Sequence, residues 1–312
     1  MVRVFTDPRC LEHPAPRGFP ERPDRLSGIL DHLRGRDFLV DEGGVPEGDP
    51  AVAAALAAVH DADYVERFRH AALRGDSLLD SADNPISGES FAAAWAAVAA
   101  TLRAADYALA GEQAFAAVRP PGHHAERALA MGFCFFNNVA VAAQYLRDQG
   151  AARVAIFDFD VHHGNGTQHL FEGRADIFYA STHQYPFYPG TGAANETGVG
   201  EGAGATLNVP LPAGTGDEGY AAAIEEQVLP GLRRFAPDVL LLSAGFDAWQ
   251  DDPLGGMAVS EAGFARWGTL LRGLADEVSG GRLLAVLEGG YDIPHLPRLV
   301  EAHLFGLAGQ AG

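Results

Sequence analysis

Apolar runs that read as buried strands recur along the chain and alternate with longer segments that read as helices. The clearest strand candidates are residues 114–118, 153–159, 176–182, 205–211, 238–247 and 282–290. Helices are predicted at residues 90–110, 136–149, 217–234 and 260–278, with Ser90 and Ser260 as N-caps of the first and the last. Strands that are apolar throughout and separated by helices indicate a parallel sheet with helices on both faces.

The N-terminal third of the chain carries no comparable strand signal. Residues before about 110 read as helices and loops, including a proline-rich segment at 10–26. No linker, repeat or low-complexity tract divides the 312 residues. We therefore expect a single α/β domain over residues 1–312, which is long enough to bury a sizeable core.

Composition narrows the classes of function. The formal net charge is −19, and all 22 basic residues are arginine, a lysine-free composition compatible with a bacterial source. So acidic a chain argues against nucleic-acid binding and weakly favours cationic substrates. No apolar run approaches the ~18 residues of a membrane helix, and the N-terminus does not resemble a secretory signal. With only Cys10 and Cys134, we expect a cytoplasmic protein without a disulfide framework.

Polar residues cluster where the predicted strands end. In an open α/β sheet, ligands bind at the carboxyl ends of the strands, so residues at these ends are candidates for a site. The candidates are His123, His124, Asp158, Asp160, His162, Asp247 and Tyr291. Each of them alone is equally compatible with a structural role, such as a hydrogen-bonded strand end or a helix N-cap. Their joint placement at neighbouring strand ends favours a functional site.

A metal site is the simplest reading of these carboxylates and imidazoles. Asp160 and His162 are two residues apart, so in an extended segment their side chains point to the same side, and Asp247 could supply a third ligand. Three nitrogen and oxygen ligands that leave a position open are typical of catalytic zinc. The same set also suits Fe²⁺ or Co²⁺.

Five segments together resemble a known family. They read RPPGHHAERALAMGFCFFNNVAVAA, IFDFDVHHGNGTQHLF, STHQYPFYPGTG, SAGFDAWQDDPLGG and EGGYD. In this order they are similar to the zinc-dependent histone deacetylase family, and most to its class II and bacterial branch, which includes acetylpolyamine amidohydrolases. The resemblance runs from about residue 21 to about residue 295. It implies the three-layer α/β/α arginase-deacetylase fold around a mostly eight-stranded parallel sheet.

The resemblance also implies roles for individual residues. It implies one zinc ion held by Asp160, His162 and Asp247. It implies catalytic roles for His123, His124 and Tyr291, with Asp158 and Asn165 as partners of the two histidines. A structural potassium ion would be held by Asp158, Asp160, His162, Ser181 and Thr182. Substrate would contact Gly132, Phe133, Tyr188, Leu254 and Gly289, and a loop acid, either Asp80 or Asp83.

The implied reaction is removal of an acetyl or other acyl group from the side-chain amine of lysine in a protein or peptide, by metal-activated water. Leu254 stands where polyamine-specific relatives carry an acidic gatekeeper, which favours acetyl-lysine over the alternative, acetylpolyamines or other small acetylated amines. Asn165 replaces the aspartate of class I members and indicates class II. Phe19 replaces a family histidine, and we expect only a local packing change.

Two further readings are weaker. A ureohydrolase with two manganese ions shares the fold, but it would need more carboxylates than the sequence offers beside Asn165 and the histidine pair. An inactive acyl-lysine binding protein would be expected to lack a metal ligand or Tyr291, and neither is missing. A homo-oligomer is compatible with the sequence, which does not determine the physiological substrate.

Overall fold

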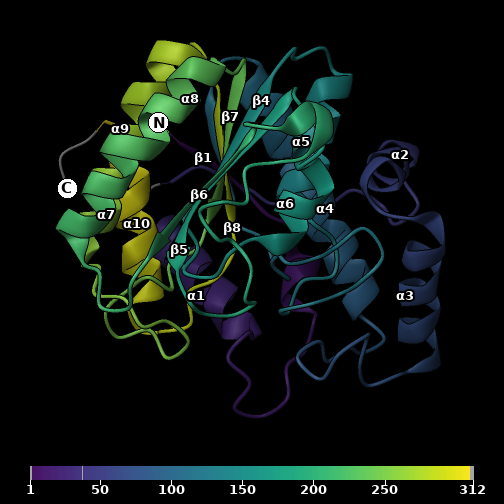
Figure 1. The fold of residues 1–312 in the computed structure, drawn as a ribbon. Helices are drawn as coiled ribbons and strands as arrows, with labels where there is room; N and C mark the ends of the chain where they lie inside the picture. The colour runs from purple at the N-terminus through teal and green to yellow at the C-terminus, as the bar shows by residue number, and fades with distance from the viewer. Residues whose placement is uncertain (1, 37, 310–312) are drawn as a thin grey trace.

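Eight parallel strands form one sheet through the centre of the molecule (Figure 1). The computed structural model describes residues 2–36 and 38–309. The strands lie in the order β2-β1-β3-β8-β7-β4-β5-β6. Their bounds are β1 Arg3–Phe5, β2 Val40–Asp41, β3 Gln113–Ala116, β4 Val154–Asp158, β5 Ile177–Gln184, β6 Thr206–Leu211, β7 Val239–Ala244 and β8 Leu283–Leu287. The eight-stranded parallel sheet expected from the sequence is confirmed.

Helices cover both faces of this sheet and make the three layers (Figure 1). One layer contains α7 Asp217–Ala223, α8 Leu229–Phe235, α9 Glu261–Val278 and α10 Leu296–Leu307, with α1 Pro23–Arg34 against α10. The other contains α2 Pro50–Val59, α3 Ala62–Arg74, α4 Ser90–Leu109, α5 Asn138–Asp148 and α6 Asn165–Phe171. Every residue of β3, β4, β5, β7 and β8 is buried, which explains why β4, β7 and β8 are almost uniformly apolar.

Of the two predicted N-cap residues, Ser260 is confirmed and Ser90 is one residue too late. Ser260 is the N-cap of α9, and its hydroxyl accepts from the Gly263 N–H at 3.3 Å. Ser90 was predicted as the N-cap of α4, but that position belongs to Glu89. The Ser90 hydroxyl instead accepts from the Ser87 N–H at 2.8 Å, in the turn before the helix.

The helix predicted at 217–234 is not a regular α-helix throughout. A π-helical turn, Ile224–Val228, separates α7 from α8, and the Leu229 N–H donates to the Ile224 carbonyl five residues back. Pro230 has no N–H and its ring crowds the preceding turn, so the α-helical pattern cannot pass through it unchanged. A π-helical turn is one recognised way in which a long helix accommodates such a break.

The N-terminal third is mostly helices and loops, as expected, but it also contains two short strands, β1 and β2, that the sequence did not reveal. β1 has three residues and β2 has two, too few for alternation or an apolar run to reveal a strand. β1 pairs with β3 and β2 with β1, so both extend the sheet at one edge.

The loops that follow the strands gather along one edge of the sheet, at the bottom of Figure 1. At this edge Asp158, the last residue of β4, lies in register with Ser181 of β5 and Ser243 of β7. The site candidates therefore come from five adjacent strands, β3, β8, β7, β4 and β5. Among the described residues, no helix is both long and apolar enough to cross a bilayer.

Candidate active site

Asp160, His162 and Asp247 meet beyond the ends of β4 and β7. One ligand atom from each lies within 4.8 Å of the other two, and this is the only such three-residue group found among the described residues. His162 Nδ1 lies 3.1 Å from Asp160 Oδ1 and 3.2 Å from Asp247 Oδ2. Both carboxyl groups are buried. The structure thus brings together all three ligands that the sequence predicted.

Two glycines give these carboxylates room to approach each other. A Cβ on Gly289 would lie 2.2 Å from Asp247 Oδ2 and 2.6 Å from Asp160 Oδ2, and one on Gly245 would lie 2.2 Å from Asp160 Oδ2. The Gly289 N–H donates to Asp160 Oδ2 at 2.8 Å. Gly289 was expected to bind substrate, but it does not line the pocket described below and instead lies against the carboxylates.

The charges of this cluster call for a cation. Burial and the neighbouring Asp160 charge raise the pKa of Asp247 to about 7. Burial opposes ionisation of Asp160 too, but the His123 charge and the His162 hydrogen bond outweigh it and lower its pKa. Burial lowers the pKa of His162, yet both carboxylates raise it to about 10. Two buried carboxylates side by side are costly unless a positive group lies between them, and a divalent metal fits that donor set.

The tandem histidines have different partners, and their pKa values shift in opposite directions. His123 Nδ1 lies 3.0 Å from Asp158 Oδ2, and His124 Nδ1 lies 2.7 Å from Asn165 Oδ1. Burial disfavours the charged form of His123, but Asp160 and Asp158 overcome it and raise its pKa to about 10. Burial and the His123 charge lower the pKa of His124 well below its usual value. His124 is therefore the neutral imidazole of the pair and can accept a proton.

Glu288 holds the loop on which these histidines lie. Its Oε2 accepts from the Gly122 N–H at 2.6 Å and from the His123 N–H at 3.1 Å. Glu288 follows β8 directly, so these bonds tie the loop after β3 to the end of the neighbouring strand. The sequence offered no firm role for this carboxylate.

A pocket of about 310 Å³ lies beside the cluster of Asp160, His162 and Asp247, and His162 is one of its lining residues. It is lined by Asp83, His124, Gly132, Phe133, His162, Phe187, Tyr188, Leu254 and Tyr291. Four of the five predicted substrate contacts line it. Phe133 and Tyr188 are the predicted aromatic walls of the pocket. Leu254 contributes an apolar side chain at the position where polyamine-specific relatives carry an acidic one. The neighbouring Asp252 turns away and accepts from the Tyr291 and Leu254 N–H groups.

Tyr291 lines this pocket and is itself largely buried. Its ring is 5.8 Å from the Phe133 ring, centroid to centroid, and the Arg25 guanidinium lies 4.7 Å from its centroid on a face. Burial raises the pKa of the Tyr291 hydroxyl well above 10, so this group remains a hydrogen-bond donor.

The loop of residues 80–84 shapes one side of the pocket. Asp83 lines it and accepts from the Gly132 N–H at 3.0 Å, while Tyr188 OH donates to the same Asp83 Oδ2 at 3.3 Å. Asp80 instead pairs with Arg67 and accepts from the Ala130 N–H. The structure therefore places Asp83, and not Asp80, where a substrate could be contacted.

Gly132 and Phe133 form a tight turn that needs this support. Both have left-handed backbone conformations, with φ of 56° and 69°. A Cβ on Gly132 would lie 2.4 Å from the His124 ring, so glycine is required there. The Phe133 N–H donates to Asn84 Oδ1 at 2.9 Å, a contact that no sequence spacing could have indicated.

The residues predicted to hold potassium lie behind the metal cluster. Asp158 Oδ1 accepts from the Asp160 N–H at 3.2 Å, and Ser181 Oγ is 2.8 Å from His183 Nδ1. Asp158, the last residue of β4, and Ser181 and Thr182, inside β5, are fully buried. This placement is compatible with one small site, although Ser181 already has a hydrogen-bond partner.

Two residues near the site, Phe187 and Glu126, were missed from the sequence, and a third, Phe19, was expected to affect only local packing. The Phe187 ring stacks on the His162 ring with centroids 5.3 Å apart and lines the pocket. Glu126 accepts from the Asn165 amide at 2.6 Å. Phe19 lies edge-on to Phe133 at 5.1 Å, which agrees with a local packing change but places it beside the pocket wall. Phe187 stands next to Tyr188 in a quoted motif and was the easiest to suspect.

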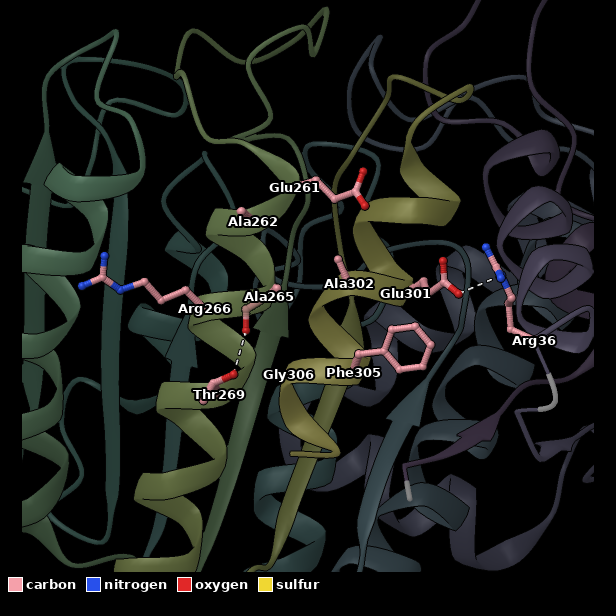
Figure 2. Close-up of a pocket in the computed structure, with 10 residues that line it drawn as sticks. All are labelled: Arg36, Glu261, Ala262, Ala265, Arg266, Thr269, Glu301, Ala302, Phe305 and Gly306. Atoms are coloured by element: carbon pink, nitrogen blue, oxygen red, sulfur yellow. Dashed lines mark hydrogen bonds and ion pairs between the residues drawn. The ribbon is translucent and has the colours of Figure 1, made fainter. Parts of the chain in front are cut away.

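A larger hollow of about 730 Å³ is lined by residues of α9 and α10, with Arg36 at one side (Figure 2). Small residues of the two helices, such as Ala265 and Gly306, leave it open. Its charged groups are already paired, Arg36 with Glu301 at 3.0 Å and Glu261 with Arg298 at 3.2 Å. None of the predicted site residues lines it.

Comparison with known proteins agrees with this geometry. The family model described as a histone deacetylase domain matches residues 19–307. The chain is 40% identical over 286 residues to a probable deacetylase of Archaeoglobus fulgidus, covering 91% of this chain and 79% of that protein. It is 39% identical over 294 residues to a histone deacetylase-like amidohydrolase of Pseudomonas aeruginosa, covering 92% and 76%. The solved structure of an acetylpolyamine aminohydrolase from Burkholderia pseudomallei superposes with a TM-score of 0.88 at 32% identity and covers all of both chains.

These findings establish the class of the protein. The family match spans nearly the whole chain, relatives near 40% identity cover nine tenths of it, and the shared fold carries the predicted motifs at its strand ends. The protein is therefore a hydrolase of the deacetylase and amidohydrolase class, and it belongs to the histone deacetylase family.

Proposed function

We propose that this protein is a zinc-dependent deacetylase that hydrolyses the amide of acetyl-lysine side chains in proteins or peptides. One observation carries the proposal: a buried Asp160–His162–Asp247 cluster lies at the base of a narrow aromatic-walled pocket that also contains the neutral His124. Such a pocket suits an extended aliphatic chain that ends in an acyl group.

The donor set supports a single catalytic metal. Asp160, His162 and Asp247 would hold it, and zinc, Fe²⁺ or Co²⁺ suits two carboxylates and one imidazole. When bound, such an ion supplies Lewis acidity for the amide carbonyl and for water. Asp158 and Ser181, with carbonyl groups of Asp160, His162 and Thr182, are proposed to hold a structural potassium ion.

The remaining chemistry falls to side chains of this chain. His124 has Nδ1 on Asn165, so its Nε2 is free to take a proton from the attacking water and to return it to the leaving amine. The raised pKa of His123, which is held by Asp158, favours its charged form, and that form would stabilise negative charge. Tyr291 would donate its O–H to the developing oxyanion, and the Gly132 carbonyl would accept the substrate amide N–H.

A second candidate is the deacetylation of acetylpolyamines or other small acetylated amines. It is favoured by the similarity to an acetylpolyamine aminohydrolase over the whole length of both chains. Two observations argue against it. Leu254 in the pocket is apolar, and the Asp252 carboxylate accepts from the Tyr291 N–H and does not line the pocket. Two buried cysteines without a disulfide support a cytoplasmic location for either activity.

The test is a turnover assay with the purified, zinc-reconstituted protein on a panel of acyl-lysine peptides and acetylated polyamines. We expect acetyl-lysine peptides to give the larger kcat/KM. Tyr291→Phe should lower kcat by about 10²–10³ with little change in KM, because only the transition state uses the O–H. Faster turnover of acetylputrescine would support the second candidate, and undiminished turnover by Tyr291→Phe would contradict the oxyanion role.

A further inference from the structure

Behind His124 lies a chain of hydrogen bonds that leads to the surface. His124 Nδ1 is 2.7 Å from Asn165 Oδ1, and Asn165 Nδ2 donates to Glu126 Oε1 at 2.6 Å. His169 Nδ1 lies 2.8 Å from the same Glu126 oxygen. Asn165 is buried, Glu126 is about one-fifth exposed and His169 about two-fifths. The proposed mechanism uses His124 and Asn165 but leaves Glu126 without a task.

Glu126 is fixed in place by its own backbone. Its N–H donates to the Leu129 carbonyl at 3.0 Å. Its carbonyl is 3.0 Å from Nδ1 of the buried His60. The other ring nitrogen of His60, Nε2, accepts from the Asn137 N–H at the start of α5. These bonds fix the backbone of Glu126, and the contacts to Asn165 and His169 place its Oε1 against the Asn165 amide.

An asparagine side chain can present either end to a neighbour. Its oxygen only accepts and its nitrogen only donates, and rotation by 180° exchanges the two with little change of shape. If the amide turned, its N–H would face His124 Nδ1. His124 would then have to carry its hydrogen on Nε2, the nitrogen that faces the pocket, and could no longer accept a proton there.

We propose that Glu126 is a positioning residue that locks the Asn165 amide, and through it the tautomer of His124. A carboxylate accepts hydrogen bonds and donates none when ionised, so Glu126 holds the Asn165 nitrogen toward itself at 2.6 Å, beside a longer contact of the same nitrogen to the His124 carbonyl at 3.4 Å. The Asn165 oxygen then faces His124 and selects the Nδ1–H form, which leaves Nε2 unprotonated toward the pocket. The inference rests on the proposed role of His124 as the base, but the tautomer itself does not depend on any substrate.

Substitutions of Glu126 can free or reverse the orientation of the Asn165 amide. Glu126→Gln can both donate and accept, so both amide orientations become available. Glu126→Lys only donates, so it favours the reversed amide and the Nε2–H form of His124. Because a catalytic histidine in the wrong tautomer can lose about 10⁴ in kcat, we expect Glu126→Lys to lower kcat by at least about tenfold and Glu126→Gln to have a smaller effect, with KM little changed in both.

The primary experiment is ¹⁵N NMR of the zinc-loaded protein labelled at histidine, with the His124 signals assigned by a His124→Gln variant. Wild type should show only the Nδ1–H form of His124. Glu126→Gln should show a mixture, and Glu126→Lys mainly the Nε2–H form. A wild-type His124 in the Nε2–H form, or identical tautomers in wild type and Glu126→Lys, would overturn the inference.

A second background separates positioning from general stability. Asn165→Asp places a carboxylate opposite His124, and both ends of a carboxylate accept, so Glu126 no longer orients this group. The second Asp oxygen would face Glu126 Oε1, where Asn165 Nδ2 now lies at 2.6 Å, so the two carboxylates must move apart or share a proton, and Glu126→Lys removes that repulsion. Glu126→Lys should then cost less than about twofold in kcat relative to Asn165→Asp alone. An equal loss in both backgrounds would mean that Glu126 only supports the local fold, and the inference would fail.

The matched control is Glu301→Gln. Glu301 of α10 pairs with His32 of α1 at 2.8 Å, and His32 is about one-quarter exposed. Neither residue lines the pocket. Glu301→Gln should leave kcat and the His124 tautomer unchanged. Failure of the proposed function would look different: no acylated amine would be hydrolysed by wild type, while the tautomer shift in Glu126→Lys would still support the inference.

Discussion

Single glycines decide how closely the two buried carboxylates can approach. Gly289→Ala would place a methyl group 2.2 Å from Asp247 Oδ2 and 2.6 Å from Asp160 Oδ2, so at least one carboxylate must move. Groups that orient metal ligands typically contribute 10–100-fold to metal affinity. We therefore expect Gly289→Ala to weaken zinc binding by about that factor, measured by competition with a chromophoric chelator, and to lower kcat/KM in parallel.

A control for this change exists within α9. Gly273 is exposed and an added Cβ there meets nothing within 4 Å. Gly273→Ala should leave zinc affinity unchanged and raise the free energy of unfolding by about 0.5–1 kcal/mol, since alanine is the better helix former. Equal zinc affinity in Gly289→Ala and Gly273→Ala would contradict the role given to Gly289.

The turn at residues 131–134 illustrates how one loop depends on another. Asn84 is fully buried, accepts from the Phe133 N–H at 2.9 Å and donates to Ser81 Oγ at 3.1 Å. Asn84→Ala leaves the Phe133 N–H without this partner, which costs about 1–3 kcal/mol. Because Phe133 walls the pocket, we expect a several-fold rise in KM for an acetyl-lysine peptide, together with a lower unfolding temperature.

Loss of stability alone should not have this effect on KM. Asp49 is the N-cap of α2 and accepts from the Ala51 and Val52 N–H groups, outside the pocket. Asp49→Ala should cost about 1 kcal/mol of stability. KM should stay at the wild-type value in Asp49→Ala and rise only in Asn84→Ala; the same KM in both would remove the proposed support of the turn.

The same contrast between strands and loops explains what the sequence could and could not predict. Strands such as β4 and β7 are buried on both faces, so their apolar runs identify them, and the polar residues at their ends identify Asp160, His162 and Asp247. β1 and β2 were missed because they are too short for a pattern. Asn84 and Glu126 were missed because their roles arise from loop contacts between distant segments.

The buried His303 makes the stability of the protein depend on pH. Burial lowers the pKa of His303 to about 4 from an ordinary 6.5, and its only polar contact given by the structure is Nδ1 to the Phe264 carbonyl at 3.2 Å. His303 is fully buried among aromatic side chains that include Phe159 and Phe246. Charging this imidazole therefore disfavours the folded state.

The direction of this change in stability with pH depends on whether the folded or the unfolded state binds the proton. Between pH 6.5 and 4 the unfolded chain protonates His303 and the folded protein does not, so this group lowers stability as pH falls. His303→Gln keeps a donor for the Phe264 carbonyl and removes the titration. Relative to wild type, we expect the variant to gain up to about 3 kcal/mol of unfolding free energy from pH 7 to pH 4, measured by urea denaturation of the zinc-loaded proteins. Parallel stability curves for the two proteins would show that His303 takes up its proton in the folded state as readily as in the unfolded chain.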